Sequence, residues 1–168
     1  MNEYSYTQKE SFLDKAIKLV ACVAGVMVLG WLVGMAGGAT QGYTGLVRPS
    51  FTPPDIVFSI VWPTLYALMG VSLYLTISAK TQNNGVRIAS FVLFALQLAL
   101  NLLWVPVFFK LRAYLIAFII LAMIDALVSA LIIVDFKINK WSAILLIPYL
   151  AWIIFATYLN ISIVALNA

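Results

Sequence analysis

Apolar residues dominate this chain in five long runs that short polar stretches separate. Each run is close to the roughly 20 residues that an α-helix needs to cross a hydrocarbon core of about 30 Å. Backbone groups in lipid must be hydrogen-bonded within each segment, so the pattern predicts an all-α integral membrane protein, a single bundle of five transmembrane helices over residues 1–168. The predicted spans are approximately Ala16–Ala36, Ile56–Ala79, Ile88–Phe109, Ala113–Val134 and Ala143–Val164.

The composition agrees with a protein whose environment is the lipid bilayer. Hydrophobic residues make up 64% of the 168 residues and charged residues 10%, a balance that one soluble core could not hide. Five spans cannot divide into two equal halves, which argues against an inverted-repeat transporter. The spans also lack the ring of charged side chains that a channel would use.

The basic residues indicate an orientation and not a nucleic-acid partner. The net charge is +4, but the ten Lys and Arg residues lie scattered along the span edges and form no basic patch, so we expect no nucleic acid. Seven lie on the side of the N-terminus and three on the other side. They are Lys9, Lys15, Lys18, Lys80, Arg87, Lys137 and Lys140, against Arg48, Lys110 and Arg112. The positive-inside rule therefore predicts a multi-pass protein of the cell (inner) membrane with a cytoplasmic N-terminus.

The chain contains no histidine and one cysteine, Cys22. This composition excludes Ser-His-Asp and Cys-His nucleophilic arrangements, histidine-based zinc sites and the commonest axial ligand of haem. We therefore expect no catalytic residues of these kinds, no bound metal and no resident cofactor.

The connection between the first two spans, residues 37–54, is long and rich in Gly and Pro. A connection of this length is usually either functional or disordered, and we interpret it as a lid in which Tyr43 and Phe51 close over an apolar guest. Thr52, Pro53 and Pro54 form a helix-start signal for the second span. The later connections are short and predict that sequential helices pack as antiparallel neighbours.

The second and third runs each carry a stripe of aromatic or polar residues at helical spacing. Trp62, Tyr66 and Met69 share one face of the second run, which indicates that this face borders something other than lipid. Gln97, Asn101 and Trp104 share a face of the third run. Amides facing lipid would cost a few kcal/mol each, so this face is expected to point into the bundle. It could bind a ligand or supply interhelical hydrogen bonds of about 0.6 kcal/mol each.

The fifth run repeats the combination of aromatic and small residues. Tyr149, Trp152, Ala156 and Asn160 lie near one face, with Pro148 one turn before Trp152. Tyr149 fits the aromatic belt at a membrane interface, whereas Trp152 lies deeper and fits a ligand site better. Pro148 could widen a cavity by bending the helix or could be a simple packing kink.

Two further features have both a structural and a functional interpretation. Asp125 is the one acid well inside a predicted span, so it is either an interhelical hydrogen-bonding group or part of a proton relay, and we favour the former. Gly30, Gly34 and Gly38 form a ridge of small residues that would let a neighbouring helix approach, within the chain or in a dimer.

Several of these segments together resemble the translocator protein family, also called tryptophan-rich sensory proteins (TspO) or peripheral benzodiazepine receptors. The resemblance rests on RPSFTPPDIVFSIVWPTLYALMGVSLYL, LQLALNLLWVPVFF, Asp125 and LLIPYLAWIIFATYLN, in this order. It implies a five-helix protein, usually a homodimer, whose pocket binds porphyrins, sterols and benzodiazepine-site ligands beneath the first loop. By motif, Trp62, Asn101, Trp152 and Ala156 would line this pocket, and Tyr66, Trp104, Pro148 and Tyr149 would surround it.

The chain departs from the family pattern at two places. Phe51 replaces a common tryptophan, which keeps an aromatic lid contact but loses the indole donor. The segment after Tyr158 lacks the basic residue of the vertebrate sterol-recognition motif, so cholesterol transport is not carried over.

These observations favour a receptor or carrier for a flat apolar ligand such as a porphyrin, linked to tetrapyrrole regulation or stress. Stacking on Trp62 and Trp152 and hydrogen bonds from Asn101 would hold the ligand. The alternative is an enzyme-like, light-dependent porphyrin degradation in which Trp62 and Trp152 supply redox-active indoles. A third possibility is an assembly protein without a small ligand.

Overall fold

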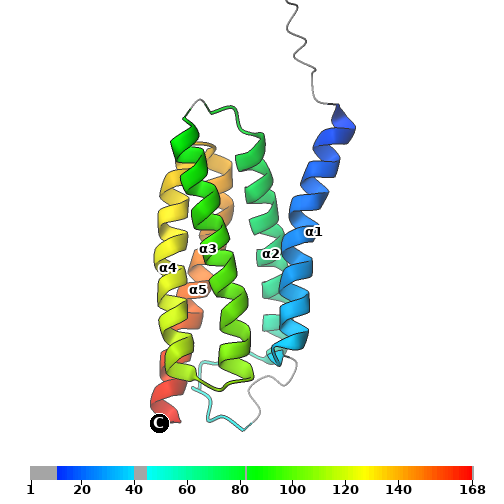
Figure 1. Ribbon diagram of the computed structural model, residues 1–168. Coiled ribbons are helices and arrows are strands. Elements are labelled where there is room, and N and C mark those ends of the chain that lie inside the picture. Colours follow the sequence, from blue (N-terminus) through cyan, green and yellow to red (C-terminus); the bar gives the residue numbers. More distant parts are fainter. Residues whose placement is uncertain (1–10, 40–44, 82, 168) are drawn as a thin grey trace, which may run out of the picture.

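The computed structural model describes residues 11–39, 45–81 and 83–167, and its fold is a bundle of five long helices (Figure 1). The helices are α1 (Phe12–Ala36), α2 (Asp55–Ser78), α3 (Asn84–Phe109), α4 (Tyr114–Phe136) and α5 (Lys140–Leu166). Each is long and apolar enough to cross a membrane. The predicted all-α membrane bundle is confirmed.

Several helices begin before the apolar runs do, because polar side chains in the connections cap them. Ser11 caps α1 by accepting the N–H of Leu13 at 3.2 Å, while Asp14 accepts the N–H of Ser11 at 3.0 Å. Asn83 and Asn139 cap α3 and α5, since their side-chain oxygens accept the backbone N–H of Val86 and of Trp141. Hydropathy reports the membrane-embedded length of a helix, whereas capping decides where the helix starts.

The helices surround the bundle axis in the order α1, α2, α5, α4, α3. Each packs against its neighbours in this ring, while α2 and α3 meet only sparsely. The prediction that all sequential helices pack as neighbours is therefore wrong for this pair. The rings of Trp62 and Trp104 lie between α2 and α3 with their centroids 6.0 Å apart, and side chains of this size hold the two backbones apart.

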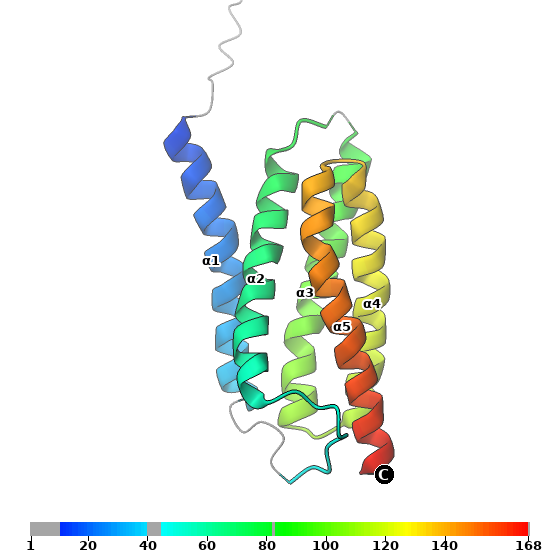
Figure 2. The same cartoon turned by 180° about the vertical axis from the view of Figure 1, so that it is seen from behind.

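Helix α1 is the most loosely attached member of the bundle, and it leans away from the others toward its N-terminal end (Figures 1 and 2). Its close contacts with α2 depend on glycines. A Cβ on Gly70 would lie 2.5 Å from Cα of Val23, and one on Gly30 would lie 2.2 Å from the Tyr66 ring. Of the predicted glycine ridge, only Gly30 permits such a helix approach, since a Cβ on Gly34 would meet nothing within 4 Å and Gly38 lies beyond the end of α1.

A polar cluster joins the other four helices at the end of the bundle where α1 begins. The carboxyl group of Asp135, 2% exposed, accepts hydrogen bonds from Ser90 at 2.5 Å, Ser142 at 2.9 Å and Thr76 at 3.2 Å. These donors come from α3, α5 and α2, and Asp135 itself from α4. The predicted fourth span ended one residue before Asp135, so the sequence analysis overlooked this buried acid.

Within the first connection, residues 45–54 run to the C-terminal end of α5 (Figure 2). The side chain of Asn167 pairs with the backbone of Val47 through two hydrogen bonds of 3.0 Å. Helix α2 then begins at Asp55, directly after the prolines, with Pro54 as its N-cap. Tyr43, expected to close the lid, lies outside the described residues.

Candidate functional site

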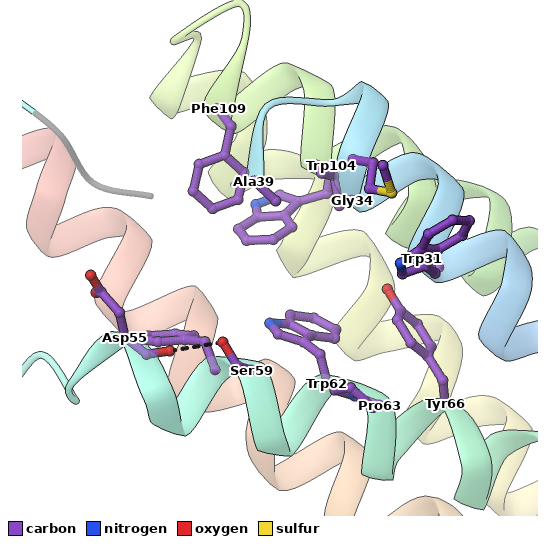
Figure 3. A pocket seen from close by; sticks show the side chains of 14 residues that line it. Trp31, Gly34, Ala39, Asp55, Ser59, Trp62, Pro63, Tyr66, Trp104 and Phe109 are labelled. Carbon is purple, nitrogen blue, oxygen red and sulfur yellow. Dashed lines mark hydrogen bonds between the residues drawn. The ribbon is translucent and has the colours of Figure 1, made fainter. Parts of the chain in front are cut away.

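A pocket of about 480 Å³ lies between α1, α2 and α3, toward the end of the bundle where the first connection runs. Its volume is in the range of small-molecule sites. Figure 3 shows its side chains, which are mainly aromatic or small. The lining residues are Gly30, Trp31, Gly34, Met35, Ala39, Asp55, Phe58, Ser59, Trp62, Pro63, Tyr66, Trp104, Val105 and Phe109.

Two tryptophans from different helices form the back of the pocket. Trp62 of α2 and Trp104 of α3 stack with an interplanar angle of 29°. Phe109 meets Trp104 edge-on, with the ring centroids 5.8 Å apart. Trp104 is buried, and its indole N–H has no hydrogen-bond partner among the described residues. The back wall is therefore flat and polarizable, with one indole donor that a guest could satisfy.

Tyr66 forms the deep end of the pocket and is held by a chain of hydrogen bonds. Its hydroxyl donates to Oδ1 of Asn101 at 2.8 Å. Nδ2 of Asn101 donates to the hydroxyl of Tyr149 at 3.1 Å, which in turn donates to Oε1 of Gln97 at 2.9 Å. The polar face of the third span thus points into the bundle as predicted, and its amides supply interhelical hydrogen bonds.

The predicted site residues consequently fall into three groups. Trp62, Tyr66 and Trp104 line the pocket. Asn101 and Tyr149 are buried behind it and act on it through the Tyr66 hydroxyl. The remaining three, Trp152, Ala156 and Phe51, lie elsewhere.

Trp152, Ala156 and Phe51 are outside the lining of this pocket. Trp152 meets the pocket residue Phe58 edge-on, with centroids 5.7 Å apart, and its buried indole N–H has no partner among the described residues. Ala156 is buried in the apolar core. Phe51 stacks on Tyr158 of α5 with centroids 5.0 Å apart, on the partly exposed surface of the bundle.

The contribution of α1 is what the sequence analysis missed. Gly30, Trp31, Gly34 and Met35 form one wall of the pocket. Trp31 is the one aromatic residue inside the first apolar run, and the glycines at positions 30 and 34 share its helix face. This combination is the available signal, whereas the small size of the glycines by itself predicts only helix packing, within the chain or in a dimer.

The chemistry of the lining is that of a binding site for an apolar molecule. Asp55 is the one charged lining residue, and its carboxylate forms an ion pair with Arg48 at 2.9 Å. Among the described residues, no three His, Cys, Asp or Glu side chains gather where they could hold a metal ion. The arrangement offers stacking surfaces, an indole donor and shape, which suit a flat ligand.

Asp125 lies apart from this pocket, between α4 and α5. Its Oδ2 accepts a hydrogen bond from the Thr157 hydroxyl at 2.8 Å, and its backbone carbonyl accepts one from Ser129 at 2.7 Å. The carboxyl group thus forms a hydrogen bond between two helices, as expected if Asp125 is an interhelical hydrogen-bonding group.

Comparison with known proteins gives matches over nearly the whole chain. The model of the TspO/MBR family matches residues 19–166. The tryptophan-rich protein TspO of Chlorobaculum tepidum is 34% identical over 92% of this chain and 99% of its own length. The tryptophan-rich protein TspO of Archaeoglobus fulgidus is 35% identical over 90% and 98%. The human translocator protein is 36% identical over 79% of this chain and 80% of its own length.

Proposed function

Because the chain belongs to the TspO/MBR family, we propose that it is a membrane receptor or carrier for porphyrins and similar flat apolar molecules, linked to tetrapyrrole regulation or the stress response. Sterols and benzodiazepine-type ligands belong to the same class of guest. The names of the relatives, translocator protein and tryptophan-rich sensory protein, agree with a receptor or regulatory role in a membrane.

The observation that carries this proposal is the aromatic wall made by Trp62 and Trp104 in a pocket with apolar surroundings. Aromatic rings prefer offset-stacked or edge-to-face contacts, which contribute about 0.5–1.5 kcal/mol per pair beyond the area they bury. A porphyrin presents a flat ring system that matches such a wall. The free indole N–H of Trp104 could donate to a polar substituent of the guest.

A titration with protoporphyrin tests the proposal. Detergent-purified protein is titrated while the porphyrin absorbance is followed, so that the readout survives removal of a tryptophan. Trp62→Leu removes a pocket wall and should weaken binding about tenfold, which corresponds to about 1.4 kcal/mol. Trp141→Leu is the matched control, because Trp141 is exposed at the start of α5, outside the pocket lining.

Two results would contradict the proposal. Equal weakening by both substitutions would mean that the porphyrin binds unspecifically to exposed aromatic surface. An unmodified protein that binds no protoporphyrin would favour the third possibility, an assembly protein without a small ligand.

An enzyme-like, light-dependent degradation of the porphyrin is the second candidate function. It is favoured by the position of Trp62, whose indole lines the pocket where a guest would lie. Trp152, the other indole considered, reaches the pocket only through Phe58. Illumination of the porphyrin-loaded protein, followed by product analysis in the unmodified protein and in Trp62→Phe and Trp152→Phe, tests this candidate. Unchanged porphyrin in the unmodified protein would remove it.

We further propose that the protein is a homodimer, in keeping with the family resemblance. Its mass in detergent, measured by light scattering with the detergent contribution subtracted, should be about twice that of one chain. A mass equal to one chain at all protein concentrations would contradict a dimer.

A further inference from the structure

Among the described residues, the exposed part of the pocket lining lies on α1 and α2, and the pocket opens there. The lining residues on α3 are buried or half-buried, and Trp104 among them forms the back wall together with Trp62 of α2. By contrast, Trp31 and Met35 on α1 are 61% and 56% exposed, and three lining residues of α2 are also exposed. We call this opening the lateral slot. It is bordered by Trp31, Gly34 and Met35 on α1 and by Asp55, Ser59 and Pro63 on α2.

The inner end of the lateral slot lies at the last close contact between α1 and α2. They are in close contact at Gly70 with Val23, and again at Gly30 with Tyr66. Beyond Gly30 the pocket residues of both helices lie between them, as Figure 3 shows for Gly34 on α1 and for Ser59 and Trp62 on α2. The Gly30–Tyr66 contact is therefore the floor of the slot.

The seam between α1 and α3 is closed near the end of the bundle. A Cβ on Gly37 would lie 2.8 Å from Cγ1 of Val105, and one on Gly38 would lie 3.7 Å from Cβ of Phe109. A guest therefore cannot pass between these two helices at this level. Within the part of the chain that the structure describes, the exposed pocket lining borders the lateral slot, between α1 and α2.

The depth of the slot places it within the membrane. Pro63 lies eight residues into α2, about 12 Å along the helix axis, and Trp31 lies about 7.5 Å before the end of α1. Both helices are membrane spans by length and composition. We therefore expect their exposed apolar side chains at this depth to face the acyl chains, and the ion pair of Asp55 with Arg48 to lie at the interfacial end.

On the basis of this geometry, and of the function proposed above, we propose that guests enter the pocket from the bilayer through the lateral slot and that Gly34 keeps the slot open. The guests are molecules that dissolve in the hydrocarbon before they bind. Gly34 lines the pocket, and a Cβ added there would meet nothing within 4 Å. A Cβ at this position is therefore free of clashes, and a longer side chain there would extend from the pocket lining into the passage.

The order of binding steps is tested with the protein reconstituted in lipid vesicles. Protoporphyrin is added at a fixed total concentration, the amount of lipid is varied, and binding is followed by tryptophan quenching. Entry through the slot requires that the binding rate follow the ratio of porphyrin to lipid. A rate that follows the free aqueous porphyrin concentration instead would overturn the proposal.

Gly34→Phe tests the passage itself, with Gly25→Phe as the matched control. Both glycines lie on α1, and at both a Cβ would meet nothing within 4 Å, but Gly25 lies outside the pocket lining. We expect Gly34→Phe to slow association and dissociation together, each about tenfold or more, and Gly25→Phe to leave both rates unchanged. Unchanged rates in Gly34→Phe, or faster dissociation with unchanged association, would overturn the proposal, since the second result describes a residue of the wall and not of the passage.

A second variant keeps the proposal testable if Gly34→Phe does not fold. In a Cys22→Ser background, Met35→Cys and Ser59→Cys place one thiol on each side of the slot. A cleavable bis-maleimide added after loading should slow porphyrin release about tenfold, and cleavage of the linker should restore it. Release that is equally fast with and without the linker would overturn the lateral slot alone, whereas an unmodified protein that binds no protoporphyrin would overturn the proposed function and this inference with it.

Discussion

At the scale of single residues, the Tyr66 hydroxyl connects the pocket to the polar interior of the bundle. It donates to Asn101, whose amide also binds Tyr149. Tyr66→Phe leaves Oδ1 of Asn101 buried without this donor, so we expect a loss of about 1 kcal/mol in the free energy of unfolding. Tyr158→Phe is the control, because Tyr158 is exposed and its ring contact with Phe51 needs no hydroxyl. Unfolding in detergent, followed by circular dichroism, measures both; equal stabilities would show that the hydrogen bond contributes nothing.

The two acids of α4, Asp125 and Asp135, differ in the number of side-chain hydrogen bonds that their carboxyl groups accept. Asp135 is buried and accepts hydroxyl groups from three helices, whereas Asp125 accepts one side-chain donor, from Thr157. An amide can replace a carboxyl that accepts one hydrogen bond, but its NH₂ group would face a hydroxyl donor in the Asp135 cluster. We therefore expect Asp135→Asn to lower the free energy of unfolding by about 2 kcal/mol and Asp125→Asn by less than about 1 kcal/mol. The reverse order, measured in the same detergent, would contradict this account of the cluster.

At the scale of helices, α1 packs closely against α2 because Gly70 of α2 has no side chain. A Cβ on Gly70 would lie 2.5 Å from the Val23 backbone and 3.0 Å from the Cys22 carbonyl oxygen. Gly70→Ala should push α1 outward and speed maleimide labelling of Cys22, the one cysteine of the chain. Gly25→Ala adds the same methyl group to α1 where nothing lies within 4 Å, and labelling should stay at the original rate. If both variants react like the unmodified protein, α1 is not held by this contact.

The separation of α2 from α3 is also a property of elements, and it creates the pocket. A connection as short as residues 79–83 usually joins neighbours in direct contact. Here two indole rings stand between the helices, while α1 and α5 pack against the sides of α2. The prediction that a short connection joins helices in direct contact therefore fails for α2 and α3, because two indole rings stand between them.

At the scale of the whole molecule, the unequal distribution of basic residues predicts a cytoplasmic N-terminus. The interfacial end of the pocket would then lie near the outer face of the membrane, since the first connection and the C-terminal end of α5 are opposite to the start of α1 (Figure 1). Reporter fusions at the two ends test this: a reporter active only in the cytoplasm should work at the N-terminus and fail at the C-terminus. Activity in the opposite pattern would reverse the orientation and place the pocket near the cytoplasm.

The sequence by itself determined the membrane class, the five helices and the inward direction of their polar faces. These properties are local, because hydropathy over about 20 residues identifies a span and spacing along one helix identifies a face. Trp62, Tyr66 and Trp104 were found in this way and do line the pocket. The sequence also supplied the family through motifs that occur in a fixed order.

Only the tertiary structure decided which faces meet. The ring order of the helices placed α1, whose glycines the sequence analysis assigns to packing and whose Trp31 it does not single out, beside the two stacked tryptophans. It placed Asn101 and Tyr149 behind Tyr66. It also buried Asp135 where its carboxyl group accepts hydrogen bonds from three hydroxyl groups of other helices. Each of these contacts joins residues on different helices. Their formation depends on how large aromatic side chains fit beside glycines of a neighbouring helix, and a pattern within one segment carries no information on that fit.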